Sequence, residues 1–149
     1  MPIKVLWVEE EPQSLRYEMK LAEQQGWEIT AVATASEALE LMNDAAFDLV
    51  VVDLILPADS FQLQRGLVDP EVGMQLITSI RDPGRKGCTL PDVPLLVITA
   101  VVSPRQKAQV VEKLTSDRYY LTKPLQNEVY REVLIELTQA WDPSKHSPL

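Results

Sequence analysis

Short apolar runs recur along this chain, and segments with a helical spacing of apolar residues separate them. The runs cover residues 3–8, 49–52, 94–98 and 119–121, and a further segment over 28–33 alternates in polarity, as expected of a half-exposed strand. Continuous apolar, β-branched runs are typical of strands that are buried on both faces of a sheet. Strands that alternate with helices predict a parallel sheet, because right-handed crossovers place helices on both of its faces. We therefore expect an α/β fold with a doubly wound, five-stranded parallel sheet.

Helix signals fill the intervals between these runs. The expected helices cover 12–26, a segment that starts at Ser36, 71–81, a segment that starts at Ser103, and 126–141. Pro12 and Pro104 stand in first turns, where proline is favoured because its missing N–H is not needed. Ser36 and Ser103 are the expected N-caps, and Gly26 is expected to end the first helix.

The composition limits the classes of partner. The chain has 149 residues and a formal net charge of −8, and its length suits one ordinary domain. Nucleic-acid surfaces need clustered Lys and Arg, so the acidic balance argues against such a partner. Cys88 is the single cysteine, so no intramolecular disulfide forms, and the first apolar run is too short for a signal peptide or a membrane span. We expect a cytoplasmic protein with no membrane association.

Polar residues terminate four of the apolar runs. They are Asp53, Thr99, Lys123 and the acidic cluster at 9–11. The carboxyl ends of parallel strands meet at one edge of the sheet, and open α/β sheets bind their ligands at that edge. We therefore expect carboxylates, a hydroxyl and an ammonium group to gather in one site.

These groups suit phosphoryl chemistry. Carboxylates from adjacent strands form an oxygen-rich site for a hard cation such as Mg2+. A carboxylate beside such a cation can attack phosphorus, because the cation neutralises charge on the phosphoryl group. Lys123 would pair with the new phosphoryl oxygens, and the hydroxyl of Thr99 would donate to another of them. The residues thus predict reversible phosphorylation of Asp53.

Four stretches of the chain, in this order, resemble the receiver domain of two-component response regulators. They are VEEEP at 8–12, DLVVVDLILP at 48–57, VITA at 97–100 and YLTKP at 120–124. The resemblance covers about residues 3–141 and implies a flavodoxin-like (βα)5 sandwich. It predicts a receiver domain over 1–141 that contains an inserted loop over 58–72, followed by a short polar tail over 142–149.

The resemblance also implies a metal site. It makes Asp53 the phosphoacceptor and places Glu9 and Glu10 where the family has its acidic pair. It implies that the backbone carbonyl of Ile55 joins Asp53 and this pair as a ligand of Mg2+. The family usually has two aspartates at the pair. Because Mg2+ accepts little error in its octahedral shell, the longer glutamates predict metal binding that is altered rather than absent.

The remaining implied roles concern the switch. Thr99 is similar to the family's switch hydroxyl, and Lys123 to the lysine that pairs with the phosphoryl group. Tyr120 matches the aromatic residue that turns inward when the hydroxyl moves toward the phosphoryl group. The peptide bond before Pro124 is usually cis in the family.

The segment after Asp53 is longer than the family's usual connection. Pro57 and Gly73 are sixteen positions apart, where the family has only a few residues. We interpret the inserted loop as a surface loop in preference to a lid from which Asp59 reaches the metal.

The residues and the resemblance together predict a signalling switch. A histidine kinase or a phosphotransfer protein is the expected phosphodonor, and a downstream protein effector is the expected recipient of the signal. The face made by the fourth helix, the fifth strand and the fifth helix is expected to contact that effector. A homodimer is also possible. Only eight residues follow Trp141, so the output is expected in a partner. Catalysis is expected only as the domain's own Mg2+-dependent phosphotransfer and dephosphorylation.

The residues also leave two alternative functions to compare with this switch. A degenerate receiver would act as a phosphorylation-independent protein-interaction module, if the glutamates at 9 and 10 no longer support Mg2+ binding. A hydrolase that works through an aspartyl intermediate is disfavoured. Such enzymes of the haloacid type place the nucleophile after the first strand, commonly with a second Asp two residues on. Here the first strand leads into Glu9, and Ile55 stands two residues after Asp53.

Overall fold

The computed structural model describes residues 2–57, 71–100 and 102–141, and its strands form one five-stranded parallel sheet. The strands are β1 (Ile3–Val8), β2 (Trp27–Val32), β3 (Leu49–Val52), β4 (Leu95–Thr99) and β5 (Tyr120–Thr122). Their order across the sheet is β2-β1-β3-β4-β5, and every neighbouring pair is parallel. This order is the flavodoxin-like one, so the expected doubly wound α/β fold is confirmed.

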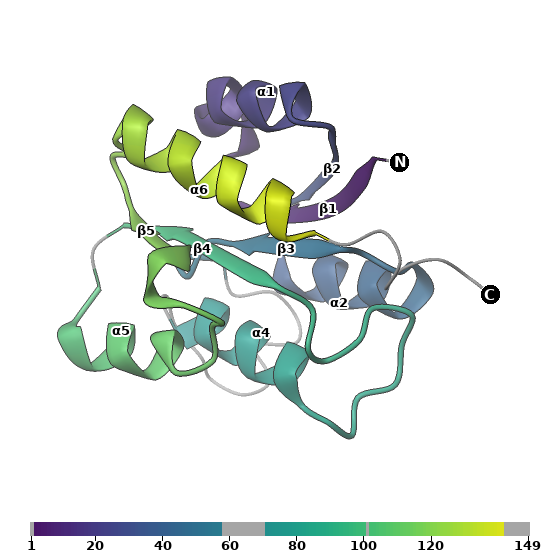
Figure 1. Cartoon of the computed structure of the whole chain (residues 1–149). Coiled ribbons are helices and arrows are strands. Elements are labelled where there is room, and N and C mark those ends of the chain that lie inside the picture. Colours follow the sequence, from purple (N-terminus) through teal and green to yellow (C-terminus); the bar gives the residue numbers. More distant parts are fainter. Residues whose placement is uncertain (1, 58–70, 101, 142–149) are drawn as a thin grey trace.

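Helices cover both faces of this sheet (Figure 1). They are η1 (Pro12–Leu15), α1 (Arg16–Gln24), α2 (Ala35–Asp44), α4 (Glu71–Arg81), α5 (Pro104–Val111), η2 (Asp117–Tyr119) and α6 (Asn127–Ala140). The helices α1 and α6 lie over one face, and α2, α4 and α5 lie over the other. The chain therefore forms three layers, which leaves the strand ends as the accessible edges of the sheet.

Two apolar layers result from the alternation of side chains along each strand. In β1, Leu6 and Val8 pack toward the α2, α4 and α5 face, whereas Val5 and Trp7 pack toward α1 and α6. All four are at most 1% exposed. Burial of β1 on both faces explains why its run is nearly continuous rather than alternating in polarity.

Of the two predicted N-caps, Ser103 is confirmed and Ser36 is wrong. Ser103 caps α5, and Gln106 completes a reciprocal capping box, as the Ser-Pro pair suggested. The cap of α2, however, is Thr34 and not Ser36, because the Thr34 hydroxyl accepts a hydrogen bond from the Glu37 N–H. Thr34 stands three residues before a Glu that its hydroxyl also contacts, which is the spacing of a capping box. Ser36 has no acid at that distance.

Other element limits differ from the expected ones by a few residues. The strand β2 begins one residue early because Trp27 pairs with Ile3, the first residue of β1. Tyr119 belongs to η2 rather than to β5. Residues 71 and 72 of the expected loop belong to α4, while 58–70, with Asp59, and the tail over 142–149 lie outside the described residues. Within the described part of the chain, no helix combines the length and the apolar character that crossing a membrane requires.

Candidate functional site

The candidate site lies where β1 and β3 end side by side in the middle of the sheet. Asp53 directly follows β3, and its N–H donates to the carbonyl of Val8 at 3.0 Å, which places it beside Glu9. The order of the strands reverses between β1 and β3, and in open α/β sheets ligands bind at such a reversal, at the carboxyl ends of the strands. The fold therefore presents Glu9 and Asp53 at the position where a ligand is expected.

Asp53 is a buried carboxylate with hydrogen bonds to both of its oxygens. Its side chain is 6% exposed. Oδ1 accepts from the hydroxyl of Thr99 and from the N–H of Ile55, each at 2.9 Å, and Oδ2 accepts from Nζ of Lys123 at 2.9 Å. A buried charge is stable only when it is paired and hydrogen-bonded, and these contacts meet that condition.

Lys123 joins the carboxylates of two strands. Its Nζ lies 2.9 Å from Glu9 Oε2 and 2.9 Å from Asp53 Oδ2. The backbone N–H of Lys123 donates to the carbonyl of Thr99 at 2.8 Å, which places the lysine at the end of β5 beside β4. Burial alone would lower the pKa of Lys123, but its bonds with Asp53 and Glu9 outweigh this effect and raise that pKa. The ammonium group is therefore stabilised in its charged form.

Glu9 is the second buried carboxylate, and 3% of the residue is exposed. Its Oε1 accepts a hydrogen bond from the N–H of Glu11 at 3.2 Å. Burial raises the pKa of Glu9, and the nearby charge of Asp53 adds to this rise, whereas the bond with Lys123 opposes it. The site thus has two adjacent acids that share one ammonium group.

The expected residues do not all converge. Glu10 is exposed, unlike Glu9. Ile55 contacts Asp53 through its N–H, while the expected ligand was its carbonyl. Among the described residues, no group of three Asp, Glu, His or Cys side chains is placed to hold a metal ion. The metal-binding roles of Glu10 and of the Ile55 carbonyl therefore stay predictions.

The donor chemistry of the site nevertheless suits Mg2+. Glu9 and Asp53 each place a carboxylate oxygen 2.9 Å from the ammonium of Lys123, so both acids can act on one positively charged group. Magnesium sites commonly use one or two carboxylates and complete the octahedron with water and phosphate oxygens. Two acids therefore fit the protein's share of such a site.

Tyr120 is buried next to this cluster. The residue is 8% exposed and packs in the apolar layer between the sheet and α5. Burial, together with the charge of Asp53, raises the pKa of its phenol. Lys107 of α5 holds its Nζ 5.2 Å from the centre of the Tyr120 ring, a cation–π contact. No pattern in the sequence indicated this contact, because the two residues are thirteen positions apart on different elements.

A close backbone contact also supports the loop after Asp53. The N–H of Gly73 in α4 donates to the carbonyl of Leu54 at 3.1 Å. A Cβ atom at Gly73 would lie 2.3 Å from the Cα atom of Leu54, so only glycine fits there. A glycine inside the helix predicted over 71–81 was the available signal, since glycine is unfavourable at such positions.

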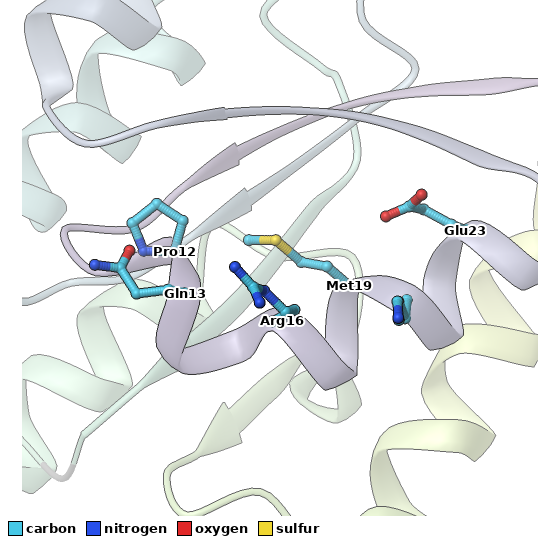
Figure 2. Close-up of a pocket in the computed structure, with 6 residues that line it drawn as sticks. Pro12, Gln13, Arg16, Met19 and Glu23 are labelled. Carbon is cyan, nitrogen blue, oxygen red and sulfur yellow. The ribbon is translucent and has the colours of Figure 1, made fainter.

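A separate hollow of about 520 Å³ lies along η1 and α1 (Figure 2). Its lining residues are Pro12, Gln13, Arg16, Met19, Lys20 and Glu23. Neither Glu9 nor Asp53 lines it. This hollow is therefore separate from the cluster of Glu9, Asp53 and Lys123 at the strand ends.

Known proteins resemble this chain in sequence. The family model of the response regulator receiver domain matches residues 5–135. The chain is 27% identical over 137 residues to the sensor protein GacS of Pseudomonas syringae. This match covers 91% of this chain and 13% of GacS. It is also 27% identical over 108 residues to the transcriptional regulatory protein CitT of Bacillus subtilis, covering 72% of this chain and 39% of CitT. The chain thus spans well under half the length of either relative.

The solved structures agree with the fold. A CheY-like response regulator receiver domain protein from Methanospirillum hungatei JF-1 superposes with a TM-score of 0.70. The match covers 98% of both chains at 18% identity, which shows a common fold. Because the family model spans most of the chain, this protein belongs to the response regulator receiver domains, the phospho-accepting signalling domains of two-component systems.

Proposed function

We propose that Asp53 is the phosphoacceptor of this receiver domain. The observation that carries the proposal is the convergence on the Asp53 carboxylate of Lys123, Thr99 and the acidic Glu9. Each of these residues comes from a different strand end. A carboxylate with an ammonium and a hydroxyl at hydrogen-bond distance has the partners that an acyl phosphate needs.

The proposed step is an in-line transfer from a phosphorylated histidine of a partner protein. An oxygen of Asp53 attacks phosphorus, the P–O bond forms, and the P–N bond to the donor imidazole breaks. The imidazole keeps the electron pair of that bond and takes up a proton. Lys123 then pairs with the new phosphoryl oxygens, and the Thr99 hydroxyl transfers its hydrogen bond from Asp53 to the phosphoryl group.

Magnesium fits this proposal as a bound cofactor. The carboxylates of Glu9 and Asp53 would hold it, with the Ile55 carbonyl and Glu10 as the further ligands that the family resemblance implies. When bound, Mg2+ would neutralise negative charge on the transferred group. Asp53 and Lys123 would act in the same way as described above, the first as nucleophile and the second as counter-charge.

The proposed partners are a histidine kinase or a phosphotransfer protein and a downstream protein effector. Movement of Thr99 toward the phosphoryl group would loosen the contacts around Tyr120, whose ring packs against the α5 side of the sheet. The surface of α5, β5 and α6 is therefore the proposed place where an effector reads the phosphorylated state.

Intact mass spectrometry after incubation with Mg2+ and acetyl phosphate tests the proposal. The wild-type chain is expected to gain the mass of one phosphoryl group, and Asp53→Asn is expected to gain none. Asp92→Asn is the matched control, because Asp92 is exposed in the loop before β4, at the opposite edge of the sheet. A phosphoryl group that persists in Asp53→Asn would assign the acceptor elsewhere. Its absence from wild type would favour a phosphorylation-independent interaction module.

A further inference from the structure

We infer that the ammonium of Lys123 is the resident counter-cation of this site, and that Glu9 sets a low Mg2+ affinity by holding it there. The inference deepens the proposed function, because it assigns a regulatory property to the same site. Its basis is the set of contacts around one nitrogen atom, Lys123 Nζ, which lies 2.9 Å from an oxygen of Glu9 and 2.9 Å from an oxygen of Asp53.

Glu9 has no uncommitted carboxylate oxygen in this arrangement. Its Oε2 bonds to Lys123, and its Oε1 accepts from the backbone N–H of Glu11. The side chain is 4% exposed, so water contributes little to its solvation. A metal ion that takes Glu9 as a ligand must therefore share an oxygen that already bonds to Lys123 or to the Glu11 N–H.

Asp53 is engaged to the same degree. Thr99 and the Ile55 N–H bond to Oδ1, and Lys123 bonds to Oδ2. With the ammonium in place, an approaching dication would share both carboxylates with a positive charge. Like charges at such short range repel strongly where water is scarce. Metal binding and the Glu9–Lys123 bond are therefore in competition.

The length of Glu9 is what makes this competition specific to the chain. Replacing Glu9 by aspartate removes one methylene and draws the carboxylate back by about 1.5 Å, the length of a C–C bond. With Lys123 still held by Asp53, a contact of 2.9 Å would then exceed hydrogen-bond distance unless the backbone or the lysine side chain moved. The shorter acid would stay available to a metal while Lys123 remained with Asp53.

Titration of the unphosphorylated 149-residue chain with Mn2+ tests the inference. Free Mn2+ is followed by electron paramagnetic resonance, and Mg2+ is added as a competitor. Glu9→Asp and Lys123→Met are each expected to bind Mn2+ about fivefold more tightly than wild type, the factor expected for loss of a partly exposed ion pair. Glu9→Gln is expected to bind more weakly, because it keeps the length and loses the charge. Lys113→Met, at an exposed lysine just after α5, is the control and should match wild type.

A second readout needs no substitution. The side-chain NMR resonance of the Lys123 ammonium is expected to shift as Mg2+ is added, because its bond with Glu9 opens. A resonance that stays in place during saturation overturns the inference, and so does Mn2+ binding by Glu9→Asp that is no tighter than in wild type. Glu9→Asp and Lys123→Met alter opposite ends of the same bond. If one of these variants misfolds, the Mn2+ affinity of the other still tests the inference.

The inference and the proposed function fail separately. If wild type gains a phosphoryl group at Asp53 but Glu9→Asp binds metal no more tightly, only the inference is overturned. If the order of affinities is as expected but no phosphoryl group appears, the phosphoacceptor proposal is overturned and the competition between Lys123 and metal stands.

Discussion

At the scale of single residues, the site shows what a buried carboxylate requires. Asp53 has little access to water, and its oxygens instead accept hydrogen bonds from a hydroxyl, a backbone N–H and an ammonium group. Thr99 is fully buried and directs its hydroxyl to Asp53 Oδ1 at 2.9 Å. Its hydroxyl therefore has a structural role in the unphosphorylated protein, in addition to the role proposed for it after phosphorylation.

Thr99→Val keeps the shape of the side chain and removes this donor. Hydrogen bonds to charged groups contribute about 1.5–3 kcal/mol, so the free energy of unfolding is expected to fall by about that amount. Thr99→Ser, which keeps the hydroxyl, is expected to lose less. Urea denaturation of the three proteins measures the difference, and equal losses in the valine and serine variants would contradict a role for the hydrogen bond.

At the scale of elements, the start of α4 is joined to the end of β3. Gly73 and Leu54 are in contact through backbone atoms, and Leu54 is the residue that follows Asp53. The position of α4 and the position of Asp53, the proposed phosphoacceptor, are therefore coupled. Of the residues that connect these two elements, 58–70 lie outside the described part of the chain, yet the contact itself is between described residues.

Gly73→Ala is expected to disturb both stability and the site. Its Cβ atom would lie 2.3 Å from the Leu54 Cα atom, so α4 or the loop must move. Overpacking of this kind costs about 1–3 kcal/mol, and phosphorylation of Asp53 is expected to slow because the loop beside it shifts. Gly84→Ala is the control, because its Cβ atom would lie 3.4 Å from Asp82 Oδ1, an ordinary contact. Thermal unfolding and the mass-spectrometric assay measure the two effects.

At the scale of the whole molecule, α1 and α6 are joined over one face of the sheet (Figure 1). The hydroxyl of Tyr130 in α6 donates to the carbonyl of Glu18 in α1 at 2.6 Å, and the indole of Trp27 donates to Thr138 of α6 at 3.0 Å. Tyr130 is 1% exposed, so the helices that meet there form part of the core. The face that holds them is opposite to the one that carries Tyr120.

Alkaline pH is expected to weaken the protein through Tyr130. Burial, with a smaller contribution from the charge of Glu18, raises the pKa of this phenol far above its ordinary value of 10.0. Above pH 10.0 the unfolded chain has lost a proton that the folded protein keeps, so stability falls as the pH rises. One such proton gives a slope of at most about 1.4 kcal/mol per pH unit.

The slope is measured by denaturant unfolding at pH values on both sides of 10.0. Tyr130→Phe is expected to flatten the decline. Tyr17→Phe is not expected to flatten it, because Tyr17 is exposed and its hydrogen bond from Arg131 lowers its pKa. A decline of equal steepness in wild type and Tyr130→Phe would contradict the proposed source of the effect.

The strands and the meeting of Asp53, Thr99 and Lys123 at one edge were predictable from the pattern of residues. Apolar runs and helical spacing repeat over short distances, and parallel strands necessarily place their carboxyl ends together. The start of α5 was predictable for the same reason, since a cap involves neighbours in the chain. The choice of Thr34 over Ser36 also depended on local residues and was predicted wrongly.

Other features depend on distances between remote atoms. The sequence does not show that Glu9 turns into the site while Glu10 faces solvent, because both are glutamates at adjacent positions. It does not show that Lys123 pairs with both acids, that Gly73 meets the backbone of Leu54, or that Lys107 lies over Tyr120. Local preferences are sensitive to a few neighbouring residues, whereas these contacts are set by how completed elements pack, to within a fraction of an ångström.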